Sequence, residues 1–329
     1  MVITLGAFDG FHTGHQRLFK TARRMAEVLR TDWGVVTFEP HPGIYMGKIK
    51  AVMFEQRERE VLRRALGVPH LYNIKFDEKL RNLSAEEFLT RLNERIKIHG
   101  IVVGDNFRFG KNHEGGLDDL RHFCLTHNAG LCILNIDIYA MSSAKGRKRV
   151  AGGVTNKLLY ELGYPWFIWT KVIKGNQRGR ELGYPTANLD IADRALFPCE
   201  AVYAAAVPIF DDKAQDMSWH AACVSVGRNP TFKDVNELRA EVYITDFEGD
   251  LYNKDIQVFF LNKLRRVREF ANQDELIEQI GLDVKRSRRF FDLAFKPDER
   301  RDIFMKFAAA IRDMTSENFK PKIISLNDK

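Results

Sequence analysis

The sequence predicts an α/β domain built on a parallel sheet, followed by a small antiparallel β-barrel that ends in a helix. The chain has 329 residues, enough for roughly two domains at about 150 residues each. Before about residue 139, short apolar runs alternate with amphipathic stretches, which is typical of a parallel sheet covered by helices. After about residue 165, β-rich runs follow one another, as in small barrels. We expect domains at 1–165 and 166–295, and a C-terminal extension at 296–329 to which the sequence assigns no role.

The first domain is predicted from its periodicity. Strands are expected at residues 2–5, 34–38, 101–103 and 131–139. Helices are expected at residues 16–30, 55–66 and 117–128, with a further helix beginning after residue 84. Ser84 and Glu87 form a capping box in front of the apolar positions of that last helix. In a parallel sheet, ligands bind in the loops at the carboxyl ends of the strands.

The second domain reads as short strands separated by turn-forming clusters. Strands are expected at residues 167–173, 202–209, 221–226, 238–244 and 256–260. A long helix is expected at 274–293 and an amphipathic one at 298–315, followed by a polar tail.

Composition and charge exclude several classes of protein. Hydrophobic residues make up 45% and charged residues 29%, and the net charge of +7 suits anionic partners. No apolar run approaches the ~20 residues needed to span a bilayer, and no secretory signal is visible at the start. The four cysteines form no CxxC pair. We therefore expect a cytoplasmic protein with reduced thiols, and neither a membrane, a secreted nor a structural zinc protein.

A ten-residue segment between the first strand and the first helix carries the first chemical signal. Residues 6–15 read Gly-Ala-Phe-Asp-Gly-Phe-His-Thr-Gly-His. Glycines let the backbone approach a ligand, and a helix N-terminus favours negative charge. His12 and His15 can both face a phosphate in that turn and stabilise charge on a phosphoryl group under attack. The alternative is a glycine-rich turn with two solvated histidines, which we reject because the whole pattern directly follows a strand.

This segment resembles the GxFDGxHxGH signature of the HxGH nucleotidylyltransferases, and the chain resembles the bifunctional riboflavin kinase/FMN adenylyltransferases of prokaryotes. Residues 37–42 are similar to that family's TFxPHP loop, and residues 104–110 to its G-x-[DN]-F-x-F-G segment. The resemblance implies a Rossmann-like nucleotidylyltransferase domain at 1–165. It also implies that the nucleotide is bound by Gly6, Phe8, Asp9, Gly14, Asn106, Ser143 and Arg147.

One motif of the family is altered. Its Ser-Ser-Thr-x-Ile-Arg segment appears here as residues 142–147, with Ala144 in place of Thr and Gly146 in place of Ile. In the family this segment holds ATP phosphates, with Arg147 as the matching cation. We expect this segment to be a loop that Gly146 makes more flexible. The missing threonine hydroxyl removes a hydrogen bond worth ~1 kcal/mol. The neighbouring lysines are more simply explained as part of a solvated basic loop.

A second glycine-rich segment follows the start of the predicted barrel. Residues 175–188 read Gly-Asn-Gln-Arg-Gly-Arg-Glu-Leu-Gly-Tyr-Pro-Thr-Ala-Asn, and such a loop can wrap a nucleotide. Thr186 and Asn188 offer a hydroxyl and an amide oxygen, ligands that Mg²⁺ accepts beside phosphate oxygens. The segment is not a Walker A loop, because no Gly-Lys-Ser/Thr follows the glycines. The alternative to a nucleotide-binding loop is a plain glycine-rich turn. It matches the signature of riboflavin kinases, which implies a riboflavin kinase-like barrel at 166–295. The implied nucleotide-binding residues are Gly175, Gly179, Arg180 and Gly183.

The predicted strand at 238–244 is similar to the one that carries the kinase family's catalytic glutamate, matched here by Glu241. Phosphoryl transfer to an alcohol needs a carboxylate to orient the attacking hydroxyl. The alternative is that Glu241 is one of many solvent-facing strand residues. Two positions depart from the family. Asn253 replaces a turn glycine, and asparagine tolerates positive φ. Val267 replaces an acid beside Arg265, which predicts an altered flavin contact.

The resemblance implies an ATP-dependent enzyme with Mg²⁺ as cofactor and riboflavin, FMN and ATP as small-molecule substrates. It would phosphorylate riboflavin to FMN and then transfer AMP to FMN, giving FAD and pyrophosphate. One alternative is a riboflavin kinase with weak or lost adenylyltransferase activity, which an assay supplied with FMN would reveal. Another is that the basic surface binds nucleic acid or a protein, although no basic–aromatic stacking module is present. We expect neither a membrane nor a nucleic acid as partner.

Overall fold

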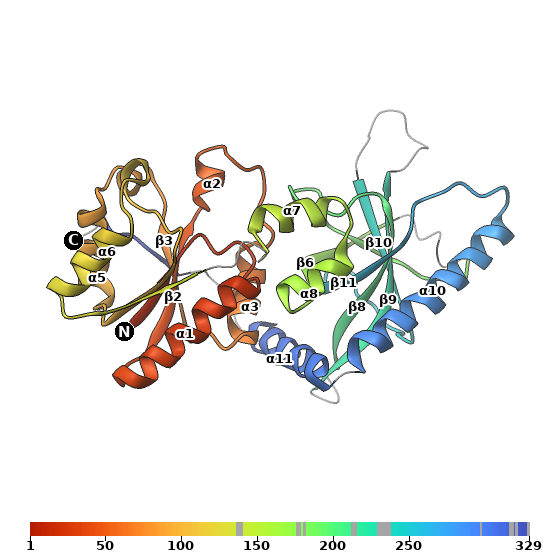
Figure 1. The fold of residues 1–329 in the computed structure, drawn as a ribbon. Coiled ribbons are helices and arrows are strands. Elements are labelled where there is room, and N and C mark those ends of the chain that lie inside the picture. The colour runs from red at the N-terminus through yellow and green to blue at the C-terminus, as the bar shows by residue number, and fades with distance from the viewer. Residues whose placement is uncertain are drawn as a thin grey trace. The chain divides into compact units, whose positions relative to one another are not determined.

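The computed structural model describes residues 1–135, 141–175, 179, 182–211, 216–228, 238–296, 298–315, 319 and 322–327. They form two compact units, a parallel sheet with helices and a closed barrel with helices (Figure 1). The first unit comprises Met1–Val52, Leu62–Ser143 and Phe319–Lys329, and the second comprises Met53–Val61 and Ala144–Asn318. The predicted fold class is therefore confirmed.

The first unit is built on six parallel strands in the order β12-β3-β2-β1-β4-β5. These are β1 (Val2–Leu5), β2 (Trp33–Glu39), β3 (His70–Lys75), β4 (Gly100–Gly104), β5 (Gly130–Leu134) and β12 (Ile323–Ile324). The helices between Thr13 and Thr126 are α1 (Thr13–Leu29), α2 (Pro42–Tyr45), α3 (Gln56–Ala65), α4 (Glu78–Arg81), α5 (Ala85–Ile96) and α6 (Leu117–Thr126). The residues of α3 up to Val61 belong to the second unit. A 3-10 turn, η1 (Lys111–His113), precedes α6. β1 lies between β2 and β4, so the strand order reverses at β1, and the loops after β1 and β4 lie at the same edge of the sheet, where ligands bind in folds of this kind.

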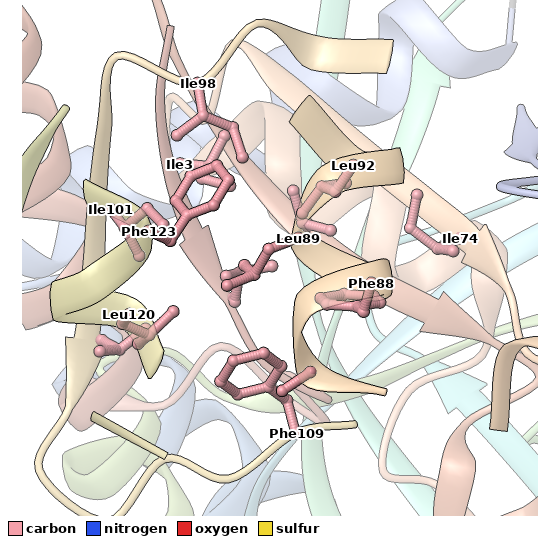
Figure 2. Packing of buried hydrophobic residues seen from close by; sticks show 14 of the residues in the cluster. Ile3, Ile74, Phe88, Leu89, Leu92, Ile98, Ile101, Phe109, Leu120 and Phe123 are labelled. Carbon is pink, nitrogen blue, oxygen red and sulfur yellow. The ribbon is translucent and has the colours of Figure 1, made fainter. Parts of the chain in front are cut away.

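The core of this unit explains why the loops have a rigid base. Side chains of α5 and α6, among them Phe88 and Leu120, gather with strand residues such as Ile3 and Ile101 in one buried cluster (Figure 2). The capping box predicted for α5 is present: the Ser84 hydroxyl accepts from the backbone N–H of Glu87, and the Glu87 carboxylate accepts from the backbone N–H of Ser84. The start of α5 is thereby fixed where the sequence predicts it.

The second unit is a closed barrel with the strand order β10-β7-β6-β11-β8-β9, in which every pair is antiparallel. The strands are β6 (Trp166–Ile173), β7 (Ala187–Leu189), β8 (Ala201–Asp211), β9 (Asp216–Arg228), β10 (Leu238–Ile244) and β11 (Asp255–Arg265). Its helices are α7 (Ser143–Ala151), α8 (Thr155–Leu162), α10 (Gln273–Phe295) and α11 (Asp298–Thr315). Phe307 of α11 is fully buried against Phe167 and Phe259 of the barrel wall, with ring centroids 5.4 and 5.2 Å apart.

Several local predictions need correction. The segment at 142–147 is not a loop, because α7 begins at Ser143 and buries Gly146 and Val150, one helical turn apart, on one face. The polar tail contains β12, which pairs with β3. The strand predicted at 131–139 ends at Leu134 as β5, and residues 136–140 lie outside the described part of the chain. None of the described helices combines the length and apolar character needed to cross a membrane.

Candidate active sites

The first candidate site lies at the N-terminus of α1, in the loop after β1. His12 is the N-cap residue, and its Nδ1 accepts from the backbone N–H of His15 at 3.4 Å. The two imidazole rings are stacked, with centroids 3.5 Å apart. The fold therefore brings the two predicted histidines together at the end of a helix that favours negative charge.

Burial keeps both imidazoles neutral near pH 7. It lowers the pKa of His12 from 6.5 to about 4, and it places the pKa of His15 well below its usual value, with a further contribution from His12. His12 accepts on Nδ1, so its ring proton resides on Nε2. His15 Nδ1 is buried and finds no hydrogen-bond partner in the described part of the chain. A buried polar atom of this kind is suited to a ligand, because leaving it unpaired is costly.

The rest of the loop shapes the approach to these histidines. Phe8 is buried at a positive φ of 41°, and its ring meets that of His15 edge-on at 4.9 Å. A Cβ on Gly6 would lie 3.0 Å from the Phe8 ring, so glycine is needed for this close approach. Asp9 is almost fully buried, and Gly14 is buried in the first turn of α1.

Two hydroxyl groups from other segments donate hydrogen bonds to backbone carbonyls of this loop. Thr37, from the TFxPHP-like segment, donates to the carbonyl of Ala7 at 3.1 Å. Ser143 donates to the carbonyl of Asp9 at 2.9 Å. The structure thus gives Ser143 a bracing contact that sequence reasoning missed. Arg147 lies one helical turn beyond Ser143 in α7, within the second unit, and its role stays a prediction.

Beside the loop is a cavity of about 730 Å³, within the range of ligand-binding pockets. Its walls are largely aromatic: Phe38, Phe76, Phe88, Phe107, Phe109 and Tyr45. Lys48, Arg81 and Arg108 add positive charge, and the predicted residues Gly6 and Asn106 also line it. The motifs identified Asn106, Phe107 and Phe109, whereas Tyr45 and Arg81 come from the four-residue helices α2 and α4, which carry too short a pattern to be recognised.

The second candidate site lies on the barrel where β7 meets β10. Glu241 is the direct cross-strand partner of Asn188, and the Thr186 hydroxyl donates to Glu241 Oε2 at 3.1 Å. The strand register thus gathers the predicted catalytic carboxylate and both predicted metal ligands, although Glu241 is far from the other two in sequence.

Glycines of the preceding loop permit close packing around these residues. A Cβ on Gly175 would overlap the Asn188 side chain, and one on Gly179 would overlap the carbonyl of Tyr184. Gly183 adopts a positive φ of 78°. Arg180 lies outside the described residues.

A cavity of about 390 Å³ opens beside this loop. The predicted residues Gly175, Thr186 and Asn188 line it together with Lys174. Its apolar wall comes from Ile173, Val242, Ile244, Phe247, Leu251 and Tyr252. The cavity thus has a lysine and side-chain oxygens that can bind a metal ion on one part of its lining, and an apolar surface on another. This combination suits a nucleotide, which has both charged phosphates and an apolar base.

The two altered kinase positions have structural explanations. Asn253 adopts a positive φ of 60°, as expected for a residue that replaces a turn glycine. Val267 is about half exposed, and Arg265 is instead paired at 2.8 Å with Asp283 of α10, which is almost fully buried. The arginine therefore keeps a carboxylate partner without the acid that is missing at position 267.

The chemistry of the donor set at the barrel site fits Mg²⁺. In the described part of the chain, no three His, Cys, Asp or Glu residues are clustered as for a metal centre. The Thr186 hydroxyl, the Asn188 amide and the Glu241 carboxylate nevertheless offer oxygen ligands. Mg²⁺ prefers one or two protein oxygens completed by phosphates and water.

Comparison with known proteins identifies a family for each half of the chain. A family model described as FAD synthetase matches residues 1–140, and one described as riboflavin kinase matches residues 162–291. A curated bifunctional riboflavin kinase/FMN adenylyltransferase from Listeria monocytogenes is 30% identical over 298 residues, which are 88% of this chain and 92% of that protein. One from Escherichia coli K12 is 31% identical over 305 residues, covering 89% and 93%.

A solved structure shares the architecture. It is described as a macrolide-efflux protein from Streptococcus pneumoniae, and it matches with a TM-score of 0.77 and 31% identity over 87% of this chain and 93% of that one. Its description refers to macrolide efflux, whereas the two family models and these two curated relatives are described as enzymes of flavin metabolism.

Proposed function

The chain belongs to the family of bifunctional riboflavin kinase/FMN adenylyltransferases, and we propose how its residues carry out the two reactions. The enzyme uses ATP to phosphorylate riboflavin to FMN and to adenylylate FMN to FAD. We assign adenylylation to residues 1–165 and phosphorylation to residues 166–295. The four cysteines are free thiols, which supports the proposal of a cytoplasmic enzyme.

In adenylylation, a phosphate oxygen of FMN attacks the α-phosphorus of ATP, and the bond to the leaving pyrophosphate breaks. Negative charge collects on the phosphates at the N-terminus of α1. His12 donates from Nε2 and His15 from its own ring N–H, and both gain proton affinity when the phosphates arrive. Gly6, Phe8, Asp9 and Gly14 shape the loop around the nucleotide. Further contacts to its phosphates or base come from Asn106, Ser143 and Arg147.

We place the flavin of FMN in the aromatic cavity beside this loop. Rings such as those of Phe107 and Phe109 can pack against an isoalloxazine, and Arg81 or Lys48 can meet the FMN phosphate. This arrangement puts the attacking phosphate next to the loop that holds ATP.

In phosphorylation, the 5′-hydroxyl of the ribityl chain attacks the γ-phosphorus of ATP, and the bond to the leaving ADP breaks. Glu241 orients this hydroxyl and accepts its proton, while the hydrogen bond from Thr186 fixes the carboxylate. Thr186 and Asn188 would hold Mg²⁺, which neutralises phosphate charge when bound. The loop carrying Gly175, Gly179, Arg180 and Gly183 wraps the phosphates.

The observation that carries this proposal is the presence in one chain of two separate constellations. One is the stacked His12–His15 pair at a helix N-terminus, and the other is the Thr186–Glu241 hydrogen bond beside a nucleotide-sized cavity.

Separate assays of the two half-reactions test it. His15→Ala is expected to reduce FAD formation from FMN by about 10²- to 10³-fold and to leave riboflavin phosphorylation intact. Glu241→Ala is expected to reduce phosphorylation by about 10²- to 10⁴-fold and to leave FAD formation from FMN intact. The matched controls are His122→Ala and Glu248→Ala, both at exposed positions. Loss of both activities in either folded variant, or no FAD from FMN in the unmodified enzyme, contradicts the assignment.

A further inference from the structure

The C-terminal segment 322–327 is part of the adenylyltransferase sheet, although the riboflavin kinase model ends at residue 291. β12 adds a parallel edge strand to β3, pairing Ile323 with Asn73 and Ile324 with Ile74. Leu326 is 4% exposed and belongs to the same buried cluster as Ile74 and Leu80. This part of the extension, predicted only as a polar tail without a role, thus packs into the core of the first unit.

Asn327 makes the polar contacts that continue this packing. Its side-chain oxygen accepts from Arg91 of α5 at 3.0 Å, and its amide nitrogen donates to Asp77 Oδ1 at 3.3 Å. The same Asp77 oxygen accepts the backbone N–H of Leu80 at 2.9 Å and so caps α4. Asn327 therefore links α5 to the cap of α4.

The segment held in this way is a wall of the aromatic cavity. Phe76 lies between β3 and Asp77, and Leu80 and Arg81 belong to α4; all three line the cavity. A shift of the α4 cap moves an aromatic ring and a cation that face the bound molecule. Small displacements of such groups weaken binding, because the fit depends on a preformed wall.

We propose that segment 322–327 positions the FMN-binding wall of the adenylyltransferase cavity, with Asn327 as a positioning residue that acts through Asp77. This inference rests on the proposed placement of FMN in that cavity. The extension has a second anchor in α11, whose Phe304 and Phe307 are fully buried in the kinase unit. The extension is thus an integral part of both units.

Kinetics of Asn327 variants test the proposal. Asn327→Ala removes both contacts and is expected to raise the KM for FMN and the Kd for FMN by about three- to tenfold, with kcat for adenylylation little changed. Asn327→Asp keeps an acceptor for Arg91 but sets a carboxylate against Asp77, so it is expected to weaken FMN binding similarly. Kinase KM and kcat stay unchanged in both variants.

A double-mutant cycle and a matched control separate positioning from a general loss of stability. If Asn327 acts through Asp77, the effects of Asn327→Ala and Asp77→Ala on FMN binding are less than additive. Arg312→Ala, at an exposed position of α11 in the same extension, is expected to leave FMN binding unchanged.

Two results overturn different claims. If the unmodified enzyme binds FMN, as measured by quenching of flavin fluorescence, and Asn327→Ala binds it equally well, the positioning role is wrong. That role is also wrong if Asn327→Ala lowers only the thermal midpoint, or if its effect adds fully to that of Asp77→Ala. If the unmodified enzyme neither binds FMN without riboflavin nor makes FAD from it, the placement of FMN itself is wrong.

Discussion

Acid is expected to destabilise the adenylyltransferase unit through His12, which the fold keeps neutral. Burial lowers the pKa of His12 to about 4 in the folded state, whereas the unfolded chain takes up this proton near pH 6.5. Between these values the unfolded state binds more protons, so stability rises with pH there and is lost as the pH falls from 6.5 toward 4. The full loss is about 3 kcal/mol, of which about 2.5 kcal/mol is reached at pH 4.5.

The matched variant is His12→Asn, because asparagine is also a good N-cap and does not titrate. Urea-dependent hydrogen exchange of peptides from β1 and α1, compared at pH 7 and pH 4.5, gives the stability of this unit at each pH. The variant should lose about 2.5 kcal/mol less than the unmodified protein between the two pH values, and exposed His122→Asn should behave as the unmodified protein does. Identical pH dependence in the unmodified protein and His12→Asn would refute the reasoning.

Three further predictions concern the barrel and the cavity. Gly175→Ala places a Cβ against the Asn188 side chain. The rate of riboflavin phosphorylation, measured by chromatography of the products, should fall at least about tenfold, and FAD formation from FMN should be unchanged. Glu58→Ala removes the carboxylate that lies 2.8 Å from the Arg194 guanidinium, whose side chain is 8% exposed. Arg194 then keeps Glu55 at 3.7 Å and the Trp169 carbonyl at 3.4 Å, so chemical denaturation should show a loss of about 3–5 kcal/mol in the barrel unit. Phe107→Ala removes an aromatic wall of the cavity, and fluorescence titration should show FMN affinity reduced by about tenfold, with kinase kinetics intact.

Local patterns in the sequence predicted most of the fold. The Ser84–Glu87 capping box located α5 because its contacts lie within one helical turn. β12 could not be predicted, because its two residues carry no periodicity and its partner β3 lies about 250 residues earlier in the chain. α7 was read as a loop since its buried face presents little more than Gly146 and Val150, too narrow a stripe to register as amphipathic.

The sequence predicted which residues form the candidate sites, but it did not predict their charge state or strand pairing. Motif spacing located the histidine pair and Glu241, but it did not reveal that burial keeps His12 and His15 neutral. Nor did it show that Asn188 and Glu241 are directly paired across two strands. Charge state and cross-strand register depend on the folded surroundings of a residue, and a linear pattern does not contain them.

The altered segment at the start of α7 bears on whether the adenylyltransferase activity is weakened or lost. One contact of this segment with the histidine loop comes from Ser143, which the family pattern retains, and it reaches the backbone of Asp9. Ala144 is exposed, so its substitution removes one hydroxyl and leaves that brace in place. Loss of a single hydrogen bond is worth about 1 kcal/mol, or about fivefold in rate. This is small beside the effect expected for His15→Ala, so the altered motif favours a slower adenylyltransferase over an absent one.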